Sequence, residues 1–281
     1  MTAKDGDGWT ECSQGHRHWG LHGASGLLVV HHDEVGVPHV LMQKRSWWSH
    51  HGGTWGLPGG ARDSHEDAVT SALREAHEEA ALACEGLRVQ GVYLDDHGGW
   101  AFETVIAESG ERLAAAPAND ESTELRWVAL PDLSGRTLHP GFAATWDRIQ
   151  EAIAPETIVL DVANIVGARA ERGWWHDRLG AATRLLEAVA GLRLEHPVLA
   201  QWFPRVVAVV EGAARTAPAV PGIQVVAATG SGDDAIVDVV RRTKGWERVV
   251  VITADRELRQ RVQELGAETL GPKWLLSQLH E

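Results

Sequence analysis

Residues 60–82 read GARDSHEDAVTSALREAHEEAAL and place four glutamates at fixed offsets around one arginine of the stretch, Arg74. Asp63, followed three residues later by Glu66, resembles a capping box, which predicts a helix that begins near Ser64. Apolar side chains then recur at helical spacing and predict its buried face: Val69, Ala72, Leu73, Ala76 and Ala80. The stretch therefore predicts one amphipathic helix that carries an acidic cluster.

Three carboxylates share one arc of the predicted helix. At about 100° per residue, Glu75, Glu78 and Glu79 project from neighbouring turns, where their like charges repel one another. A hard divalent cation prefers oxygen ligands and would convert this repulsion into binding. A solvated acidic face is the usual interpretation of such a helix. Here the fixed spacing, the preceding turn at residues 57–60 and the embedded arginine favour a metal site.

The spacing resembles the Nudix box, G-x5-E-x7-R-E-U-x-E-E-x-G-U, in which U is an aliphatic residue. The chain fills it with Gly60, Glu66, Arg74, Glu75, Ala76, Glu78, Glu79 and Leu82. Ala81 stands at the final glycine and His65 at a position where many members carry glycine, and neither change removes a charge. The resemblance implies an α/β/α sandwich that hydrolyses a nucleoside diphosphate linked to another group.

The same resemblance implies a role for each polar position of the box. It implies Mg2+ or Mn2+ as the cofactor, with these ligands: Glu75, Glu78, Glu79 and the carbonyl of Gly60. It implies that Glu75 orients or deprotonates the attacking water. Arg74 and Glu66 are implied as supporting residues that align the catalytic glutamates.

Glu121 is a candidate metal ligand outside the box. It lies six residues before Trp127, at a loop-to-strand entry where several members of the resembled family carry an extra metal-binding glutamate. An acidic loop residue without a metal is an equally good interpretation. Glu103 and Glu124 are weaker candidates for the same role.

The amino-terminal segment offers a second metal hypothesis, with Cys12, His16, His18 and His22 as zinc ligands. Their spacing fits no strong zinc signature, and a second cysteine is missing. The segment is therefore predicted to hold surface or hydrogen-bonded histidines that lead into a strand. The pairs at residues 31–32 and 50–51 receive the same interpretation.

Composition predicts a two-domain protein of a reducing compartment. The chain has 281 residues, 44% of them hydrophobic, and only two cysteines, Cys12 and Cys84. No apolar run approaches the roughly 20 residues of a membrane span, and no signal peptide opens the chain. These features predict a cytoplasmic protein without a membrane partner. They predict no particular oligomeric state.

The net charge of −13 is unevenly divided. Residues 1–150 carry 11 Lys and Arg against 22 Asp and Glu, whereas residues 151–281 carry 15 against 17. The first half therefore needs a metal before it can bind a phosphate. The second half can bind a polyanion such as RNA only through local arginines.

The first half alternates strands around the acidic helix and closes with another helix. Strands are predicted at 26–30, 37–43, 90–93, 100–107 and 124–130, and the closing helix at 140–153. Pro155 interrupts the pattern, which places a domain boundary there. The predicted domains are residues 1–153 and 156–281.

In the second half, carboxylates follow predicted parallel strands directly. The strands at 157–160, 205–210 and 248–254 lead into Asp161, Glu211 and Asp255. Asp233 and Asp234 follow the strand at 223–228 and precede a helix at 235–242. Ligands gather at the carboxyl edge of such sheets, which favours a shared site. The alternative is that Asp233 and Asp255 are helix N-caps.

Residues 156–281 resemble the PIN-like nucleases, in particular their NYN branch. The resemblance rests on the segments DVAN at 161–164, VVEG at 209–212, GDDAI at 232–236 and TADREL at 253–258. It implies a parallel-sheet α/β/α domain with Mg2+- or Mn2+-dependent ribonuclease activity, in which Asn164 assists Asp161. Glu211 departs from the family pattern, since aspartate is more usual there.

The two resemblances together lead to one prediction of function and three alternatives. The predicted substrate is a nucleoside triphosphate, ordinary or oxidised, and the second domain adds a metal-dependent ribonuclease activity. The alternatives are an ADP-ribose or NAD pyrophosphatase, an RNA-processing protein that acts on 5′ ends, and a nucleotide sensor without catalysis.

Overall fold

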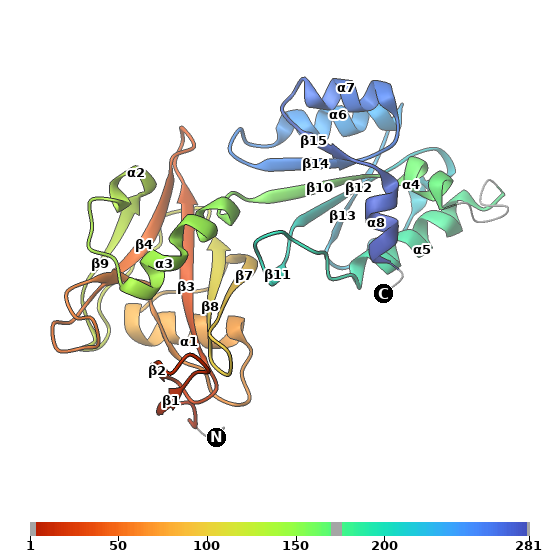
Figure 1. Cartoon of the computed structure of the whole chain (residues 1–281). Coiled ribbons are helices and arrows are strands. Elements are labelled where there is room, and N and C mark those ends of the chain that lie inside the picture. Colours follow the sequence, from red (N-terminus) through yellow and green to blue (C-terminus); the bar gives the residue numbers. More distant parts are fainter. Residues whose placement is uncertain (1–3, 170–175, 280–281) are drawn as a thin grey trace. The chain divides into compact units, whose positions relative to one another are not determined.

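The structure is a computed structural model that describes residues 4–169 and 176–279. The chain forms two compact units (Figure 1). The first unit comprises Met1–Ile153 with Glu195–Phe203, and the second comprises Ala154–Leu194 with Pro204–Glu281. The sequence placed one boundary at Pro155 and a continuous second domain after it. In the structure, Glu195–Phe203 packs with the first unit, because its two-residue strand pairs with that unit's sheet.

The first unit is built on a mixed sheet in the order β11-β7-β8-β3-β4-β5, with β6 paired to β3 and β9 to β4. Its strands are β3 (Ala24–His32), β4 (Pro38–Arg45), β5 (Trp55–Gly56), β6 (Gly59–Ala61), β7 (Arg88–Asp96), β8 (Ala101–Glu108), β9 (Ser122–Ala129) and β11 (Gln201–Trp202). A separate hairpin, β1 (Trp9–Glu11) and β2 (Arg17–Trp19), precedes them. The strands that the sequence predicted in this half are present with slightly different ends.

Alternation along β3 divides the core of the first unit into two layers. Leu27 and Val29 pack with α1 (Ala68–Ala80) on one face of the sheet. Leu28 and Val30 pack on the other face with α3 (Pro140–Ile149), which follows α2 (Leu130–Leu133) and continues into η1 (Gln150–Ala152). A strand covered on both faces needs apolar residues at consecutive positions, and β3 supplies them. The result is a mixed α/β layered fold in which one face holds the acidic helix.

The acidic helix begins later than the sequence predicted. Its N-cap is Asp67, whose side chain accepts a hydrogen bond of 2.7 Å from the backbone N–H of Thr70. Asp63 does not cap the helix, because its carboxylate accepts the backbone N–H groups of Asp5 and Gly6 at 2.9 and 2.8 Å. The prediction of a start near Ser64 is therefore wrong by one turn.

Ala81 ends α1 in the left-handed conformation, with φ of 49° and ψ of 30°. Its N–H and that of Leu82 both donate to the carbonyl of Ala76. This C-terminal motif favours glycine, because a Cβ in the left-handed region costs about 1–2 kcal/mol. The structure thus gives a physical reason for the glycine that the Nudix box carries at this position.

Ala81→Gly is expected to raise the free energy of unfolding of the first unit by about 1 kcal/mol and its Tm by about 2–4 °C. Calorimetry of the full-length chain measures the change. Ala80→Gly is the matched control, since Ala80 is fully buried inside the helix and its replacement should lower Tm. A Tm of Ala81→Gly at or below that of the wild type would contradict this explanation.

The second unit contains a fully parallel five-stranded sheet in the order β13-β12-β10-β14-β15. The strands are β10 (Glu156–Asp161), β12 (Arg205–Val210), β13 (Ile223–Ala227), β14 (Arg248–Ile252) and β15 (Glu268–Leu270). The helices are α4 (Val162–Ala168), α5 (Arg178–Ala190), η2 (Gly212–Thr216), α6 (Gly232–Arg242), α7 (Arg256–Gln263) and α8 (Pro272–Gln278). Every residue of β10 is buried, as expected for a central parallel strand covered by helices.

The strand order of this unit reverses at β10, because β12 and β14 flank it on opposite sides. In open parallel sheets such a reversal leaves a crevice beyond the carboxyl ends of the strands. The last residue of β10 is Asp161, so this carboxylate stands at the reversal. Among the helices that the structure describes, none has the length and apolar character that crossing a membrane requires.

Candidate active site

The acidic helix α1 places Glu79 against the turn that precedes it. Glu79 is only 3% exposed, and its Oε2 accepts a hydrogen bond of 3.0 Å from the backbone N–H of Gly59. Burial raises the pKa of Glu79, and the negative charges of Glu121 and Glu75 raise it further. A buried carboxylate among like charges is a group that a cation would stabilise.

Glu75 lies beside the same turn, one helical turn earlier. A Cβ at Gly60 would come within 2.6 Å of Glu75 Oε2, so the absence of a side chain lets the backbone approach the carboxylate. Burial raises the pKa of Glu75, and the charges of Glu78 and Glu121 add to the effect while Arg74 opposes it. Glu75 is thus held near the turn in an environment that favours its protonated form.

Arg74 links these glutamates to Glu66 through a set of ion pairs. Its Nε and Nη2 donate to the two Glu66 carboxylate oxygens at 2.8 and 2.9 Å, a bidentate arrangement. Its Nη1 donates to Glu75 at 2.5 Å and lies 3.6 Å from Glu78. These hydrogen bonds lower the pKa of Glu66 and raise that of Arg74. Arg74 therefore fixes the position of Glu75 through its own anchoring to Glu66.

Glu78 is the most exposed of the three neighbouring carboxylates, with 42% of its side chain accessible. Its two carboxylate oxygens, Oε2 and Oε1, accept hydrogen bonds of 3.1 and 3.2 Å from the Lys4 ammonium. This ammonium is a stand-in cation and shows that the Glu78 oxygens are directed at a place that positive charge can reach. Carboxylate oxygens from Glu75, Glu78 and Glu79 form a donor set that suits a divalent cation.

Glu121 joins this cluster, while the weaker candidates do not. Its charge raises the pKa values of Glu75 and Glu79, and its side chain is within hydrogen-bond reach of Glu79. Glu103 instead pairs with Arg62 at 3.0 Å, and Glu124 pairs with Arg126. The loop carrying Glu121 is held by the Ser46 N–H, which donates to its carbonyl at 2.8 Å.

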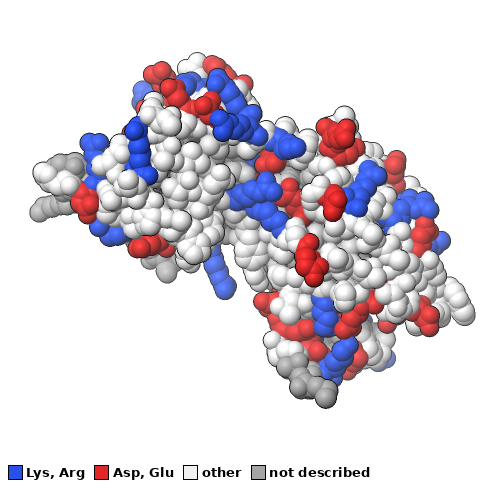
Figure 2. Space-filling view, turned by 180° about the vertical axis from the view of Figure 1, so that it is seen from behind, with Lys and Arg blue, Asp and Glu red and all other residues white. Residues whose placement is uncertain are grey.

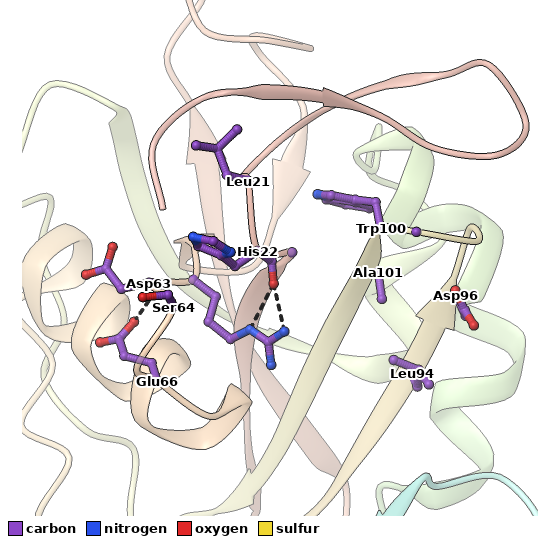
Figure 3. A pocket seen from close by; sticks show the side chains of 12 residues that line it. Leu21, His22, Asp63, Ser64, Glu66, Leu94, Asp96, Trp100 and Ala101 are labelled. Carbon is purple, nitrogen blue, oxygen red and sulfur yellow. Dashed lines mark hydrogen bonds between the residues drawn. The ribbon is translucent and has the colours of Figure 1, made fainter. Parts of the chain in front are cut away.

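A cavity of about 560 Å³ opens beside Glu66. Figure 3 shows Asp63 and Glu66 on one side of it, with Leu94, Asp96 and Trp100 on the other. The sequence did not reveal this cavity, because its wall comes from three separate segments: residues 21–23, 62–66 and 94–101. Glu66 belongs both to this wall and to the Arg74 clamp, which connects the cavity to the acidic cluster.

The second unit gathers its predicted carboxylates around Asp161. Asp161 accepts a hydrogen bond of 2.7 Å from the Thr253 hydroxyl, and its other oxygen accepts the Asn164 N–H at 3.1 Å. Burial raises the pKa of Asp161, with further contributions from the charges of Asp233 and Glu211. Burial also raises the pKa of Asp233, followed by the charge of Asp255. These four carboxylates are therefore close enough to interact.

Several members of this cluster also have structural partners. Glu211 accepts the Gly232 N–H at 2.7 Å, Asp255 caps α7, and the Asn164 amide oxygen accepts the Ala254 N–H at 2.9 Å. Asp234 turns towards Arg261 and pairs with it at 2.6 Å. Basic and acidic side chains are interspersed on the face drawn in Figure 2.

Comparisons with known proteins support a nucleotide-related role for the first unit. The family model of the NUDIX domain matches residues 21–148. The Mycobacterium tuberculosis protein named "Putative 8-oxo-dGTP diphosphatase 3" is 48% identical over 162 residues, which are 56% of this chain and 73% of that protein. A Bifidobacterium longum "Nucleoside triphosphate pyrophosphatase/Nudix hydrolase fusion protein" is 44% identical over 147 residues, 51% of this chain and 30% of that protein. The crystal structure of a Nudix hydrolase from M. smegmatis, RenU, is 47% identical, covers 52% of this chain and 94% of its own, and superposes with a TM-score of 0.50.

Proposed function

The chain belongs to the NUDIX family, and from that premise we propose that its first unit hydrolyses the pyrophosphate linkage of nucleoside triphosphates, including oxidised ones such as 8-oxo-dGTP. The observation that carries this proposal is that Glu75 and Glu79 lie beside the turn at Gly59 and Gly60. Glu78 follows on the same helix, 3.6 Å from Arg74. Burial and mutual repulsion raise the pKa values of Glu75 and Glu79, and bound positive charge would favour their ionised forms. The names of the relatives support the triphosphate, and the M. tuberculosis relative supports its oxidised form.

The donor set suits Mg2+ or Mn2+, which when bound would neutralise phosphate charge and make a water molecule more acidic. Glu79 and Glu78 would hold the ion, with Glu121 as an additional ligand. Glu75, positioned by Arg74, would accept a proton from the attacking water, since its raised pKa makes it a better base than an ordinary carboxylate. The water oxygen bonds to one phosphorus while the bond from that phosphorus to the bridging oxygen breaks.

Glu66 and Arg74 have positioning roles in this proposal. Their bidentate pair holds the guanidinium in one orientation, from which Nη1 reaches Glu75. Glu66 is protected from solvent, with only 5% of its side chain exposed, so water screens this pair little. The geometry therefore keeps Glu75 in place before substrate arrives, which is the condition for efficient proton transfer.

A second candidate activity, metal-dependent cleavage of RNA, is proposed for the second unit. The supporting observation is that the charges of Asp161, Glu211, Asp233 and Asp255 act on one another near the carboxyl end of β10. The strand order reverses there, a common place for ligand binding. Mg2+ or Mn2+ bound by these oxygens would support attack on a phosphodiester. The assignment to a PIN-like domain remains a proposal that rests on the four sequence segments and this arrangement.

A substrate panel tests the proposal for the first unit. It contains ordinary nucleoside triphosphates, 8-oxo-dGTP, ADP-ribose, NAD and RNA with a 5′ triphosphate, each assayed with Mg2+ and with Mn2+. The highest kcat/KM is expected for a nucleoside triphosphate. A kcat/KM for ADP-ribose about tenfold or more above that of every triphosphate would make ADP-ribose the substrate class instead. This ratio corresponds to about 1.4 kcal/mol in transition-state binding. Nucleotide binding without turnover would instead indicate a sensor.

A further inference from the structure

Four potential metal ligands meet between the amino-terminal hairpin and the turn that joins β7 to β8. They are Cys12, His16, His18 and His97, and their ligand atoms all lie within 4.8 Å of one another. None of them belongs to the acidic cluster of α1. One thiol and three imidazoles form a donor set of a different chemical kind from the carboxylates of that helix.

The hairpin geometry explains how three of these residues come together. The Cys12 N–H donates to the His16 carbonyl at 3.0 Å, and Gly15 takes a positive φ of 79° in the tight turn between them. His18 lies in β2 and His16 directly precedes that strand, and their ring centroids are 6.4 Å apart. The Ser13 N–H donates to the Gly98 carbonyl at 2.7 Å, which brings the hairpin beside His97.

Two ring nitrogens at this place are buried without a hydrogen-bond partner among the described residues: His18 Nε2 and His97 Nδ1. A buried polar atom without a partner destabilises the folded state, which indicates that a partner is missing here. The other nitrogen of His97, Nε2, is 3.0 Å from Asp95 Oδ2. A proton on Nε2 leaves the Nδ1 lone pair free, as in a carboxylate–histidine–metal arrangement.

The ring of His18 is also held in one orientation. Its ring stacks on Trp100 with centroids 4.0 Å apart and planes at 11°, and the Trp100 Nε1–H is anchored on the Gly20 carbonyl at 3.0 Å. The stacking holds the His18 ring in one orientation, in which its Nε2 is buried without a hydrogen-bond partner among the described residues.

We propose that Cys12, His16, His18 and His97 bind a structural transition-metal ion, for which Zn2+ fits best. Nitrogen and thiolate donors suit Zn2+ rather than the Mg2+ proposed at the acidic helix. Four protein ligands complete a tetrahedral shell and leave no open position for substrate, so the ion would be structural.

This proposal corrects the sequence-based interpretation of the amino-terminal histidines. The sequence alone does not support zinc there, because the spacing of the candidate ligands fits no strong signature and a second cysteine is missing. The structure brings His97 from a distant turn to Cys12, His16 and His18, in the place that the sequence-based hypothesis assigned to His22. His22 lies elsewhere: its carbonyl accepts two hydrogen bonds from Arg62, and its ring is 3.9 Å from Asp5. Spacing along the chain did not reveal a ligand contributed by a different hairpin.

A metal at this place would connect two parts of the cavity wall. The amino-terminal segment contributes residues 21–23 to the wall, and the β7–β8 region contributes Asp96, Gly99 and Trp100. Trp100 also contacts His18, so loss of the ion is expected to loosen this side of the cavity. The acidic cluster on α1 contains none of the four ligands, and its metal-dependent chemistry is expected to survive.

The test measures zinc in the full-length protein after reconstitution with Zn2+ and dialysis. About one equivalent per chain is expected for a closed four-ligand site. Cys12→Ser and His97→Ala should each reduce the retained zinc at least about tenfold, the consequence of losing a ligand or its fixed orientation. Cys84→Ser removes the only other cysteine and His22→Ala removes the rejected ligand, and both should retain zinc like the wild type.

Cobalt substitution identifies the ligands independently. The Co2+ form of the wild type and of Cys84→Ser should show the intense visible bands of a tetrahedral ion and a thiolate charge-transfer band, and Cys12→Ser should lose the latter. Circular dichroism confirms that each variant is folded. Zinc-free wild type after reconstitution would overturn the proposal, as would equal retention by Cys12→Ser and Cys84→Ser. The proposal would also be overturned if His139→Ala alone lost zinc while the variants of the four proposed ligands retained it. His139 lies in a separate histidine cluster, so this result would place the ion there.

Discussion

Glu78→Gln and Glu79→Gln are each expected to lower kcat for nucleoside triphosphate hydrolysis by about 10²–10⁴-fold. Each change removes one negative charge from the acidic helix and keeps the size of the side chain. Glu79 is buried and points at the turn of Gly59, while Glu78 is exposed towards Lys4. The expected loss of kcat therefore comes from the lost charge. Steady-state kinetics with saturating Mg2+ measures it.

The thermal stability of these variants distinguishes lost chemistry from lost folding. The pKa of Glu79 is raised in the folded protein, so ionising Glu79 destabilises the folded state. The free energy of unfolding therefore falls as pH rises from the unfolded-state pKa to the folded-state pKa. Glutamine removes this cost and can still accept the Gly59 N–H. At pH 8 in EDTA, Glu79→Gln should melt at or above the wild-type temperature, by about 2–4 °C for each kcal/mol of relief.

Glu78→Gln is the matched control for this effect, because its side chain is 42% exposed and should change the metal-free Tm little. Mg2+ should stabilise the wild type more than either variant, since ligand binding to the folded state raises Tm. Unchanged kcat in both variants would show that the acidic helix takes no part in catalysis. A Glu79→Gln protein that is unfolded in EDTA would show that Glu79 is primarily structural.

Asp161→Asn and Asp255→Asn are expected to lower metal-dependent RNA cleavage by about 10²-fold or more and to leave nucleotide hydrolysis unchanged. Asparagine at residue 161 keeps one oxygen that can accept the Asn164 N–H, and its amide N–H can donate to the Thr253 hydroxyl oxygen, so the local fold is expected to be retained. The substitution removes the negative charge of Asp161 from the cluster. Single-stranded RNA with Mg2+ or Mn2+ is the substrate.

Asp238→Asn provides the control for this second activity. Asp238 lies on α6, as does the cluster residue Asp233, but it pairs with Arg241 at the exposed surface. Its replacement should leave RNA cleavage intact. Wild-type protein that cleaves no RNA, or cleavage that survives both Asp161→Asn and Asp255→Asn, would contradict the proposed ribonuclease.

The sequence predicted those features that depend on neighbours along the chain. The spacing of residues 60–82 was sufficient to predict an amphipathic helix with three carboxylates on one arc, because helical geometry relates residues three and four apart. Apolar strands such as β3 and β10 were predicted for the same reason. The helix start was misplaced because Asp63 binds the distant Asp5 and Gly6 N–H groups, which local capping rules do not include.

Features that depend on distant pairing were not predictable in this way. The two-residue β11 is too short to have a pattern, and it exists because Gln201 and Trp202 pair with β7. The carboxylate cluster of the second unit was predicted from strand ends, but the pairing of Asp234 with Arg261 was not. His97 joins Cys12 only because a turn and a hairpin meet.

³¹P NMR in ¹⁸O-labelled water follows the phosphates of 8-oxo-dGTP with the full-length chain and tests metal-dependent pyrophosphate hydrolysis directly. With Mg2+ or Mn2+, we expect one pyrophosphate linkage to break and ¹⁸O to appear on one product phosphate, and we expect no reaction in excess EDTA. Glu79→Gln should give the EDTA result even with the metal present. Hydrolysis undiminished by EDTA would contradict the account, as would no hydrolysis of any nucleoside triphosphate with either metal.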